Sequence, residues 1–263
     1  MITLVFIGDV VGEPGRLALA RAIPELKREH NIDALIVNAE NAAHGRGITP
    51  KLAKDILAMG VDVITLGDHA WDQPELVDKI DTLPQVLRPV NFQSNNPGAG
   101  SFILQTSKGK VGVLCLIGRT FMRPGADNPF TAATTAIEQL KAGGASVILA
   151  DMHAEATSEK IAMAVHLDGG ATAVVGTHTH VQTADARILP GGTAAITDAG
   201  MCGSRDGIIG RNAQDVLRAQ VSAMPCKLEI AGWPVRVSGV IITADATTGR
   251  ALRIEPFNKD YDR

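Results

Sequence analysis

Three apolar segments near the amino end constrain the fold most strongly, because each of them ends in polar residues. They span residues 2–7, 34–37 and 61–66, and helix-forming segments separate them. The run 2–7 is continuous and rich in β-branched residues, a pattern typical of a strand buried on both faces. Short strand–helix–strand connections favour parallel pairing with right-handed crossovers. The pattern therefore predicts a parallel βαβαβ arrangement whose strands end at one common edge.

The helices between these strands have recognisable boundaries. Pro14 suits the start of the first helix, which continues with an apolar face until His30. The second helix opens at Thr49-Pro50, a capping residue followed by a proline at the first helical position, and it closes at Gly60.

The rest of the chain predicts a second sheet. We expect strands at 102–106, 110–117, 146–150 and 171–175, and helices at 130–142 and 157–167. Short segments indicate antiparallel strands that complete this sheet, with one helix at about 212–223 among them: 187–189, 194–196, 227–230, 235–243 and 252–254. The predicted fold is therefore α/β, with two packed sheets and outer helices, in a single domain over residues 1–263. The strands near the carboxyl end offer an edge for association, so a homo-oligomer is left open.

Composition favours a small substrate over a polymer. The 25 basic and 28 acidic residues mix along the chain and give a net charge of −3. The sequence therefore shows no basic cluster that would bind a long nucleic acid or an anionic membrane. The longest near-continuous apolar run, residues 111–117, is far below the roughly 20 residues that span a bilayer. The first residues lack a basic leader and a cleavage site. We therefore expect no membrane and no long nucleic acid as partners.

The cysteines indicate a reducing environment. Cys115, Cys202 and Cys226 are odd in number, lie far apart and lack C-x-x-C spacing. This favours neither a disulfide framework nor a thiolate metal cluster, and it predicts a cytoplasmic protein. Cys115 is expected in the core.

Polar residues at the predicted strand ends form a candidate metal site. Two of them, His178 and His180, follow the run 171–175, and an extended segment would project both imidazoles from one face. By topology, the whole set converges at the carboxyl edge of the sheets, where ligand sites of open α/β sheets lie. The set comprises Asp9, Glu40, Asn41, Asp68, His69, His153, His178 and His180.

The chemistry of this set indicates two metal ions. Carboxylate, amide and imidazole groups without sulfur suit borderline metals such as iron, manganese, zinc and cobalt. One catalytic metal takes three or four protein ligands, so eight candidates predict a pair of ions that share a bridging carboxylate, about 3.5–4 Å apart.

Other conspicuous residues have ordinary explanations. Three histidines are expected at the surface or at helix ends: His30, His44 and His166. The glycines at positions 8, 12 and 15 resemble a dinucleotide-binding loop, but Asp9 and Pro14 occupy positions where that loop would bind phosphate. Arg119 suits bidentate binding of a phosphate, and a surface role is equally open.

All eight candidate residues lie in five short motifs: Gly8-Asp9-Val10, Asn38-Ala39-Glu40-Asn41-Ala42-Ala43, Gly67-Asp68-His69-Ala70-Trp71-Asp72, and the segments 151–160 and 176–185. In this order they resemble the calcineurin-like metallophosphoesterases, and in particular their bacterial YmdB-like branch of cyclic-nucleotide phosphodiesterases. The resemblance runs from residue 8 to about residue 210, and the combination of five motifs is highly specific.

The resemblance implies a four-layer α/β/β/α sandwich of two mixed sheets and two metal ions. The two ions are commonly iron or manganese, and zinc is a further option. The implied ligands form two sets bridged by Glu40: Asp9, Asn41 and His180 for one metal, and Asp68, His153 and His178 for the other. His69 would then act as the general acid rather than as a ligand.

The activity implied by the resemblance is hydrolysis of small phosphodiesters, including the 2′-bond of 2′,3′-cyclic nucleotides. A metal-bridging hydroxide would attack the phosphorus in line while His69 protonates the leaving oxygen, a contribution of typically about 10²–10⁴-fold. Two alternatives stay open. One is a phosphomonoesterase, which would need cationic groups around the site, and the other is a metal-binding regulatory protein with little turnover.

Two positions depart from the family's pattern. The family usually has asparagine where this chain has Asp68, and the added negative charge would favour the protonated form of His69 and tighten the second metal. The regulatory alternative takes Asp68 as the change that removed turnover. Family members tend to carry threonine at the position of Cys202, and the sequence does not define the effect of this change.

Overall fold

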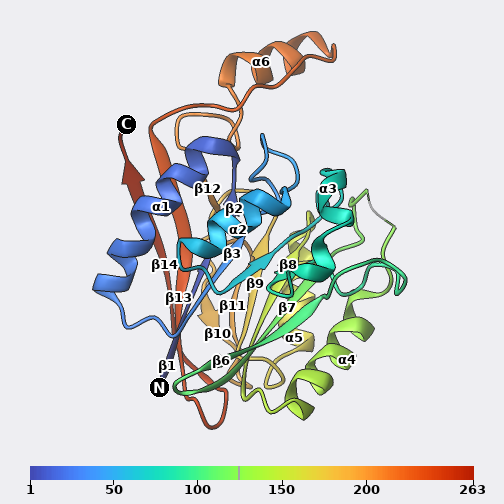
Figure 1. Cartoon of the computed structure of the whole chain (residues 1–263), viewed down its shortest axis with the longest axis vertical. Coiled ribbons are helices and arrows are strands. Elements are labelled where there is room, and N and C mark those ends of the chain that lie inside the picture. Colours follow the sequence, from blue (N-terminus) through green and yellow to red (C-terminus); the bar gives the residue numbers. More distant parts are fainter. Residues whose placement is uncertain (124) are drawn as a thin grey trace.

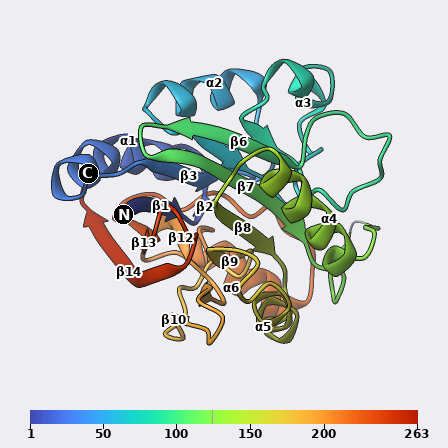
Figure 2. The ribbon, with the colours of Figure 1, turned by 90° about the horizontal axis from the view of Figure 1, so that it is seen from below.

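Four layers make up the computed structural model, which describes residues 1–123 and 125–263 (Figure 1). Two β-sheets pack face to face between two layers of helices. The helices α1 (Gly12–Glu29) and α2 (Pro50–Ala58) cover one outer face, and α4 (Pro129–Ala142) and α5 (Thr157–His166) cover the other. Figure 2 shows these two pairs on opposite sides of the ribbon. The predicted α/β/β/α fold is confirmed.

The first sheet is mixed and has eight strands, in the order β2-β12-β13-β1-β3-β4-β5, with β14 also paired to β13. Its strands are β1 (Ile2–Ile7), β2 (Asp9–Val10), β3 (Ala34–Asn38), β4 (Val63–Thr65), β5 (Val86–Leu87), β12 (Met201–Ser204), β13 (Val235–Ala244) and β14 (Ala251–Tyr261). Strands β1, β3 and β4 pair in parallel, as the sequence predicts. Two short elements, α3 (Pro74–Val77) and the 3₁₀ helix η1 (Ile80–Thr82), lie between β4 and β5.

The second sheet has six strands in the order β10-β11-β9-β8-β7-β6. They are β6 (Ser101–Thr106), β7 (Gly109–Ile117), β8 (Val147–His153), β9 (Ala173–Thr177), β10 (Arg187–Ile188) and β11 (Ala194–Ile196). Strands β7, β8 and β9 run parallel to one another. The candidate histidines His153 and His178 lie at the carboxyl ends of β8 and β9, so this sheet supplies nitrogen ligands of the predicted site.

The core forms three apolar clusters, one between each pair of layers, and β1 shows how the sequence builds them. Leu4 and Phe6 point into the cluster between the two sheets, whereas Val5 and Ile7 point toward the helices. Side chains alternate along a strand, so a continuous apolar run fills two clusters at once. Each of these four side chains is fully buried, and such burial stabilises the fold by about 1.5–3 kcal/mol per side chain.

The helix boundaries follow the capping signals in the sequence. Oγ1 of Thr49 accepts a hydrogen bond from the backbone N–H of Leu52 at 3.2 Å, and Pro50 is the first residue of α2. Helix α1 begins at Gly12, so Pro14 lies in its first turn, where the missing N–H costs nothing. Within the described part of the chain, no helix combines the length and apolar character that crossing a membrane requires.

The last third of the chain differs from the prediction in its sheet membership. Strands β13 and β14 are antiparallel, but they join the first sheet, where β13 pairs with β1. The open edge of β1 accepts β13, a strand buried along most of its length. In the second sheet, β11 runs parallel to β9 rather than antiparallel. The strand expected at 227–230 is wrong, because this segment is largely exposed and only Ile230 forms an isolated bridge, with Arg211.

The segment that carries the paired histidines is also not extended. Strand β9 ends at Thr177, and the backbone then turns, with φ angles of 96° at His178 and 67° at His180. Positive φ values are uncommon for residues other than glycine. The two imidazoles therefore leave the backbone in different directions and do not share one strand face.

Candidate metal centre

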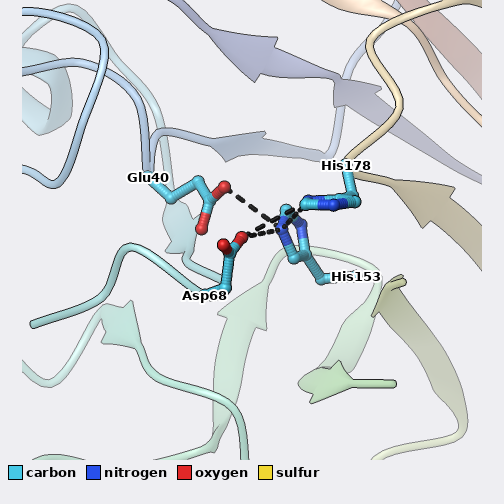
Figure 3. Close-up of side chains that lie close together, drawn as sticks. All are labelled: Glu40, Asp68, His153 and His178. Carbon is cyan, nitrogen blue, oxygen red and sulfur yellow. Dashed lines mark hydrogen bonds and ion pairs between the residues drawn. The ribbon is translucent and has the colours of Figure 1, made fainter. Parts of the chain in front are cut away.

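Four titratable side chains from separate strand ends meet in the structure (Figure 3). Each offers one ligand atom, and these atoms lie within 4.8 Å of one another: Glu40, Asp68, His153 and His178. Glu40 and Asp68 follow β3 and β4 of the first sheet, whereas His153 ends β8 and His178 follows β9 of the second. Both sheets therefore contribute to the cluster, as the predicted convergence of strand ends requires.

The contacts within this cluster centre on Nε2 of His153. This atom lies 3.1 Å from Oε1 of Glu40 and 3.0 Å from Oδ1 of Asp68. Nδ1 of His178 lies 3.0 Å from the same nitrogen and 3.3 Å from Oδ1 of Asp68. Carboxylate oxygens and imidazole nitrogens are ligands of borderline divalent metals, so this set can hold one ion.

Hydrogen bonds behind His153 determine which of its nitrogens faces the cluster. Nδ1 of His153 lies 2.9 Å from Oγ1 of Thr177, and that hydroxyl donates to Oδ1 of Asp151 at 2.7 Å. Because the hydroxyl hydrogen points to Asp151, Nδ1 of His153 donates to the hydroxyl, and Nε2 can present its lone pair to the cluster. Asp151 also accepts from Asn38 and Thr65, and burial raises the pKa of Asp151 to about 6.

A second set of predicted ligands surrounds His180. Nε2 of His180 lies 3.3 Å from Nδ2 of Asn41 and 3.9 Å from Oδ1 of Asp9. Nδ2 of Asn41 in turn donates to Oε1 of Glu40 at 3.2 Å. Glu40 therefore touches both sets, which is the position that a bridging carboxylate needs.

One atom of this second set has no partner. Oδ1 of Asp9 is buried and has no hydrogen-bond partner among the residues that the structure describes. Oδ2 of Asp9, by contrast, accepts from the backbone N–H of His178. Burial raises the pKa of Asp9, although the charge of His180 opposes this effect. A buried carboxylate oxygen without a donor is costly, and a cation beside it would offset that cost, so these residues fit a metal ion.

The pKa shifts of the first set of ligands indicate that this set favours a positive charge. Burial alone would raise the pKa of Glu40, but the charge and the hydrogen bond of His153 keep this pKa below its usual value. Burial alone would likewise raise the pKa of Asp68, which hydrogen bonds from His153 and His178 lower instead. Burial alone would lower the pKa of His153, yet the two carboxylates raise it well above its usual value. A proton on His153 thus supplies the charge that a bound cation would otherwise bring, and metal binding should release that proton.

A buried ion pair holds the turn between the two histidines. Oδ2 of Asp198 accepts from both the backbone N–H and the hydroxyl of Thr179, at 3.1 and 2.6 Å. Nζ of Lys160 donates to the same oxygen at 2.9 Å, and both charged side chains are almost completely buried. Lysine is rarely buried unless it is paired. These bonds offset the strain of the positive φ angles at His178 and His180.

Gly67 allows the two sheets to approach each other at the site. A Cβ atom at this position would collide with the ring of His153 and with the carboxylate of Glu40. Any larger residue would therefore displace two of the predicted ligands.

His69 lies at the rim of the cluster, where the sequence predicts the general acid. Its backbone N–H donates to Oε2 of Glu40 at 3.0 Å, and its Nε2 is 3.8 Å from Oδ2 of Asp68. Its Nδ1 lies 3.0 Å from Oδ2 of Asp72. Asp72 was not among the predicted site residues, although it follows His69 by three residues in the same motif, a spacing that a turn brings into contact.

An open cleft of about 660 Å³ leads to the metal-ligand candidates, which include Glu40, Asn41, His178 and His180. His69 also lines it, together with residues that were not predicted to belong to the site: Arg46, Glu155, Ile209, Arg211 and Leu228. Oε2 of Glu155 lies 3.3 Å from Nε2 of His178, so it can orient that ring. Glu155 lies in the motif at 151–160, two residues after His153, whereas no motif marks the other four, which only the folded chain brings to the cleft.

Several other residues lie outside this cleft. The exposed Arg119 lines a separate surface depression with Glu159, which accepts from its backbone N–H. Cys115 is buried in the core as predicted, and Cys202 is buried in β12, where its thiol donates to the carbonyl of Gly15. The three histidines expected at the surface or at helix ends lie there: His30, His44 and His166.

The chain resembles known proteins along almost its whole length. A sequence model of a family described as YmdB-like protein matches residues 5–257. The chain is 44% identical over 252 residues to the 2′,3′-cyclic-nucleotide 2′-phosphodiesterase of Bacillus subtilis (strain 168), covering 96% of this chain and 95% of the relative. Two solved structures are also similar. A hypothetical protein from Thermus thermophilus has a TM-score of 0.91 and 37% identity, with 98% and 99% of the two chains covered. A novel phosphatase from Mycoplasma pneumoniae has a TM-score of 0.92 and 32% identity, with 99% and 94% covered.

Proposed function

Because this chain belongs to the YmdB-like family, we propose that it is a metal-dependent hydrolase of phosphodiesters, with 2′,3′-cyclic nucleotides as substrates. The convergence of Glu40, Asp68, His153 and His178 within 4.8 Å is the observation that carries this proposal. The name of the Bacillus subtilis relative, which matches nearly end to end, supports the choice of substrate.

The proposed centre holds two metal ions in the two sets described above. Asp68, His153 and His178 would hold one ion and Asp9, Asn41 and His180 the other, with Glu40 shared. The unpartnered Oδ1 of Asp9 and the contacts of Glu40 to both sets support this division. When bound, such ions lower the pKa of water from 15.7 to about 7, which supplies a nucleophile at neutral pH, and they stabilise charge on the phosphoryl oxygens. Iron or manganese suits the nitrogen and oxygen ligands, and zinc is the alternative.

His69 is the proposed general acid. It lines the cleft beside the cluster, and Asp72 accepts from its Nδ1, which leaves Nε2 to face the substrate. An alkoxide is a poor leaving group, so a proton from Nε2 assists departure of the ribose oxygen. The side chain of Asp72 acts on the substrate only through the orientation of His69 and is therefore a positioning residue.

A phosphomonoesterase is the second candidate, and one observation favours testing it. Arg46 and Arg211 line the cleft, and a phosphomonoester carries more negative charge than a diester. However, Nε of Arg46 lies 3.7 Å from Asp72, and the guanidinium of Arg211 donates to backbone carbonyls. These contacts use part of the capacity of the two guanidinium groups to bind phosphate, so the diester is the preferred substrate.

A panel of substrates tests this function. The purified chain would be assayed with manganese or iron on 2′,3′- and 3′,5′-cyclic nucleotides, bis-p-nitrophenyl phosphate and p-nitrophenyl phosphate. We expect turnover of the 2′,3′-cyclic nucleotides and of the synthetic diester. A preference for the monoester would favour the second candidate, and bound metal without any turnover would favour a regulatory protein.

The single domain and the cytoplasmic location stay predictions.

A further inference from the structure

Residues 205–230 form an arm that reaches from the body of the protein to the candidate metal centre. The arm contains α6 (Ala213–Ser222), which Figure 1 shows projecting from the layered core. Three residues from its two ends, Ile209, Arg211 and Leu228, line the same cleft as Glu40 and His180. The arm therefore forms part of the cleft wall, although no predicted metal ligand lies on it.

Ile209 has an unusual backbone conformation at this wall. Its φ angle is 44°, in the left-handed region that β-branched residues rarely adopt. This conformation presents the Ile209 carbonyl to His180, whose Nδ1 lies 3.1 Å away. The side chain is nevertheless 51% exposed. Strain of this kind is often found at functional sites, and here it places an apolar side chain next to a predicted metal ligand.

Arg211 joins the arm to Gly45, another residue of the cleft lining. Its guanidinium donates to the carbonyl of Gly45 at 2.7 Å and to that of Leu228 at 3.3 Å. Gly45 lies in the loop that follows Glu40 and Asn41, so Arg211 joins this loop to both ends of the arm. These hydrogen bonds therefore hold the wall in place.

Apart from Arg211, the arm side chains named above that line the cleft are apolar. Ile209 and Leu228 are exposed by 51% and 38%, and the buried Val11 also belongs to the lining. These three side chains have no hydrogen-bond donor or acceptor. The cleft thus combines metal ligands in one part with an apolar surface in another, and a nucleoside cyclic phosphate has a matching division between its anionic ester and the flat face of its base.

We propose that Ile209 and Leu228 form the nucleobase-binding wall of the cleft, against which the base of a 2′,3′-cyclic nucleotide packs. This inference rests on the proposed function, because it needs the phosphate at the metal centre. Ile209 and Leu228 contact the face of the base and offer no group that reads its edge. The guanidinium of Arg211 already donates to the carbonyls of Gly45 and Leu228. The four bases are therefore accepted with small differences, and a substrate without a base binds more weakly.

A comparison of two substrates tests the proposal. One is 2′,3′-cyclic AMP, and the other is methyl β-riboside 2,3-cyclic phosphate, which has the same ester ring without a base. Leu228→Ala and Ile209→Ala should each raise KM for the nucleotide about tenfold, with kcat nearly unchanged. The same variants should leave KM for the base-free substrate unchanged. Leu228→Ala is the cleaner variant, because Leu228 makes no backbone contact with a predicted ligand.

Leu217→Ala provides the matched control, because Leu217 is an exposed leucine of α6 outside the cleft lining. It should leave KM for both substrates unchanged. Metal content and thermal unfolding of each variant show whether the site and the fold are intact. Equal effects on both substrates, or no effect in either wall variant, would overturn the nucleobase wall while the proposed function stands. A wild-type chain that hydrolyses neither substrate contradicts the proposed function itself.

Discussion

Oε1 of Glu40 lies 3.1 Å from Nε2 of His153, a contact that joins the carboxyl end of β3 in one sheet to the carboxyl end of β8 in the other. Both side chains are buried, so water does not solvate their charges. The candidate metal centre therefore exists only where the two sheets meet. Metal binding and packing of the sheets should stabilise each other, since an ion that binds only the folded chain shifts the unfolding equilibrium.

His69→Ala tests the general acid. We expect kcat for 2′,3′-cyclic AMP to fall by about 10²–10⁴-fold, because the ribose alkoxide must leave without a proton donor. The loss should be much smaller with bis-p-nitrophenyl phosphate, since p-nitrophenolate departs without protonation. Elemental analysis should find the metal content unchanged. Equal losses on both substrates, or a loss of metal, would show that His69 has a different role.

Gly67→Ala tests the close approach of the sheets at the site. The added methyl group would collide with His153 and Glu40, so metal affinity should fall by about 10–100-fold. Metal titration followed by calorimetry measures this change. Gly232→Ala is the matched control, because a Cβ at Gly232 meets no atom within 4 Å. Unaltered affinity in Gly67→Ala would mean that the two ligands can move without loss of the site.

Asp68→Asn tests the departure from the family's usual asparagine. The variant keeps the shape of the side chain but removes a negative charge 3.0 Å from Nε2 of His153. We expect about tenfold weaker binding of one of the two ions, because the charge of the ligand set contributes to affinity. Dialysis against graded metal concentrations measures the two affinities. If both ions bind as in the wild type, the extra carboxylate does not tighten the site.

Asp260 makes a pH-dependent contribution to stability through two arginines, Arg205 and Arg236. The carboxylate accepts from Nε and Nη2 of Arg236 at 2.6 and 2.8 Å, and from Nη1 of Arg205 at 3.2 Å. The Arg236 hydrogen bond is the main cause that lowers the pKa of Asp260 to about 2. A lowered pKa stabilises the folded chain above pH 3.8, the ordinary value, and this stabilisation is lost as the pH falls toward 2.

Asp260→Asn should therefore lower the free energy of unfolding by about 0.5–1 kcal/mol at pH 7, a size typical of exposed ion pairs. Urea unfolding of both proteins at pH 7 and at steps below pH 4 measures the difference. It should shrink as the pH falls toward 2, and 1 M salt should reduce it at pH 7. A difference that grows in acid would contradict the assigned pKa direction.

The sequence could predict the parts of the site that depend on strand ends. Continuous apolar runs identified β1, β3, β8 and β9, and parallel strands must bring their carboxyl ends to one edge. The backbone of His178 and His180 could not be predicted in this way. Asp198 accepts from Thr179 in this turn and is itself paired with Lys160, and both contacts arise only in the folded chain.

The sequence pattern was less informative about sheet membership and the cleft wall. An apolar run such as 235–243 predicts a strand but does not say which sheet it joins, and in the structure it pairs with β1. Ile209 lies outside the predicted strands and helices, and Leu228 lies in the segment 227–230, which the pattern wrongly predicts as a strand. They reach the cleft because Arg211 joins the arm to the loop around Gly45, a contact between distant segments.

The metal content of the purified chain tests the central claim most directly. Elemental analysis after loading with manganese or iron should find two ions per chain, and removal by a chelator should abolish hydrolysis of 2′,3′-cyclic AMP until metal is restored. Glu40→Gln, which removes the charge of the shared carboxylate, should retain fewer than two ions. Less than one ion per wild-type chain, together with no turnover in added manganese, would contradict the assignment of a two-metal phosphodiesterase.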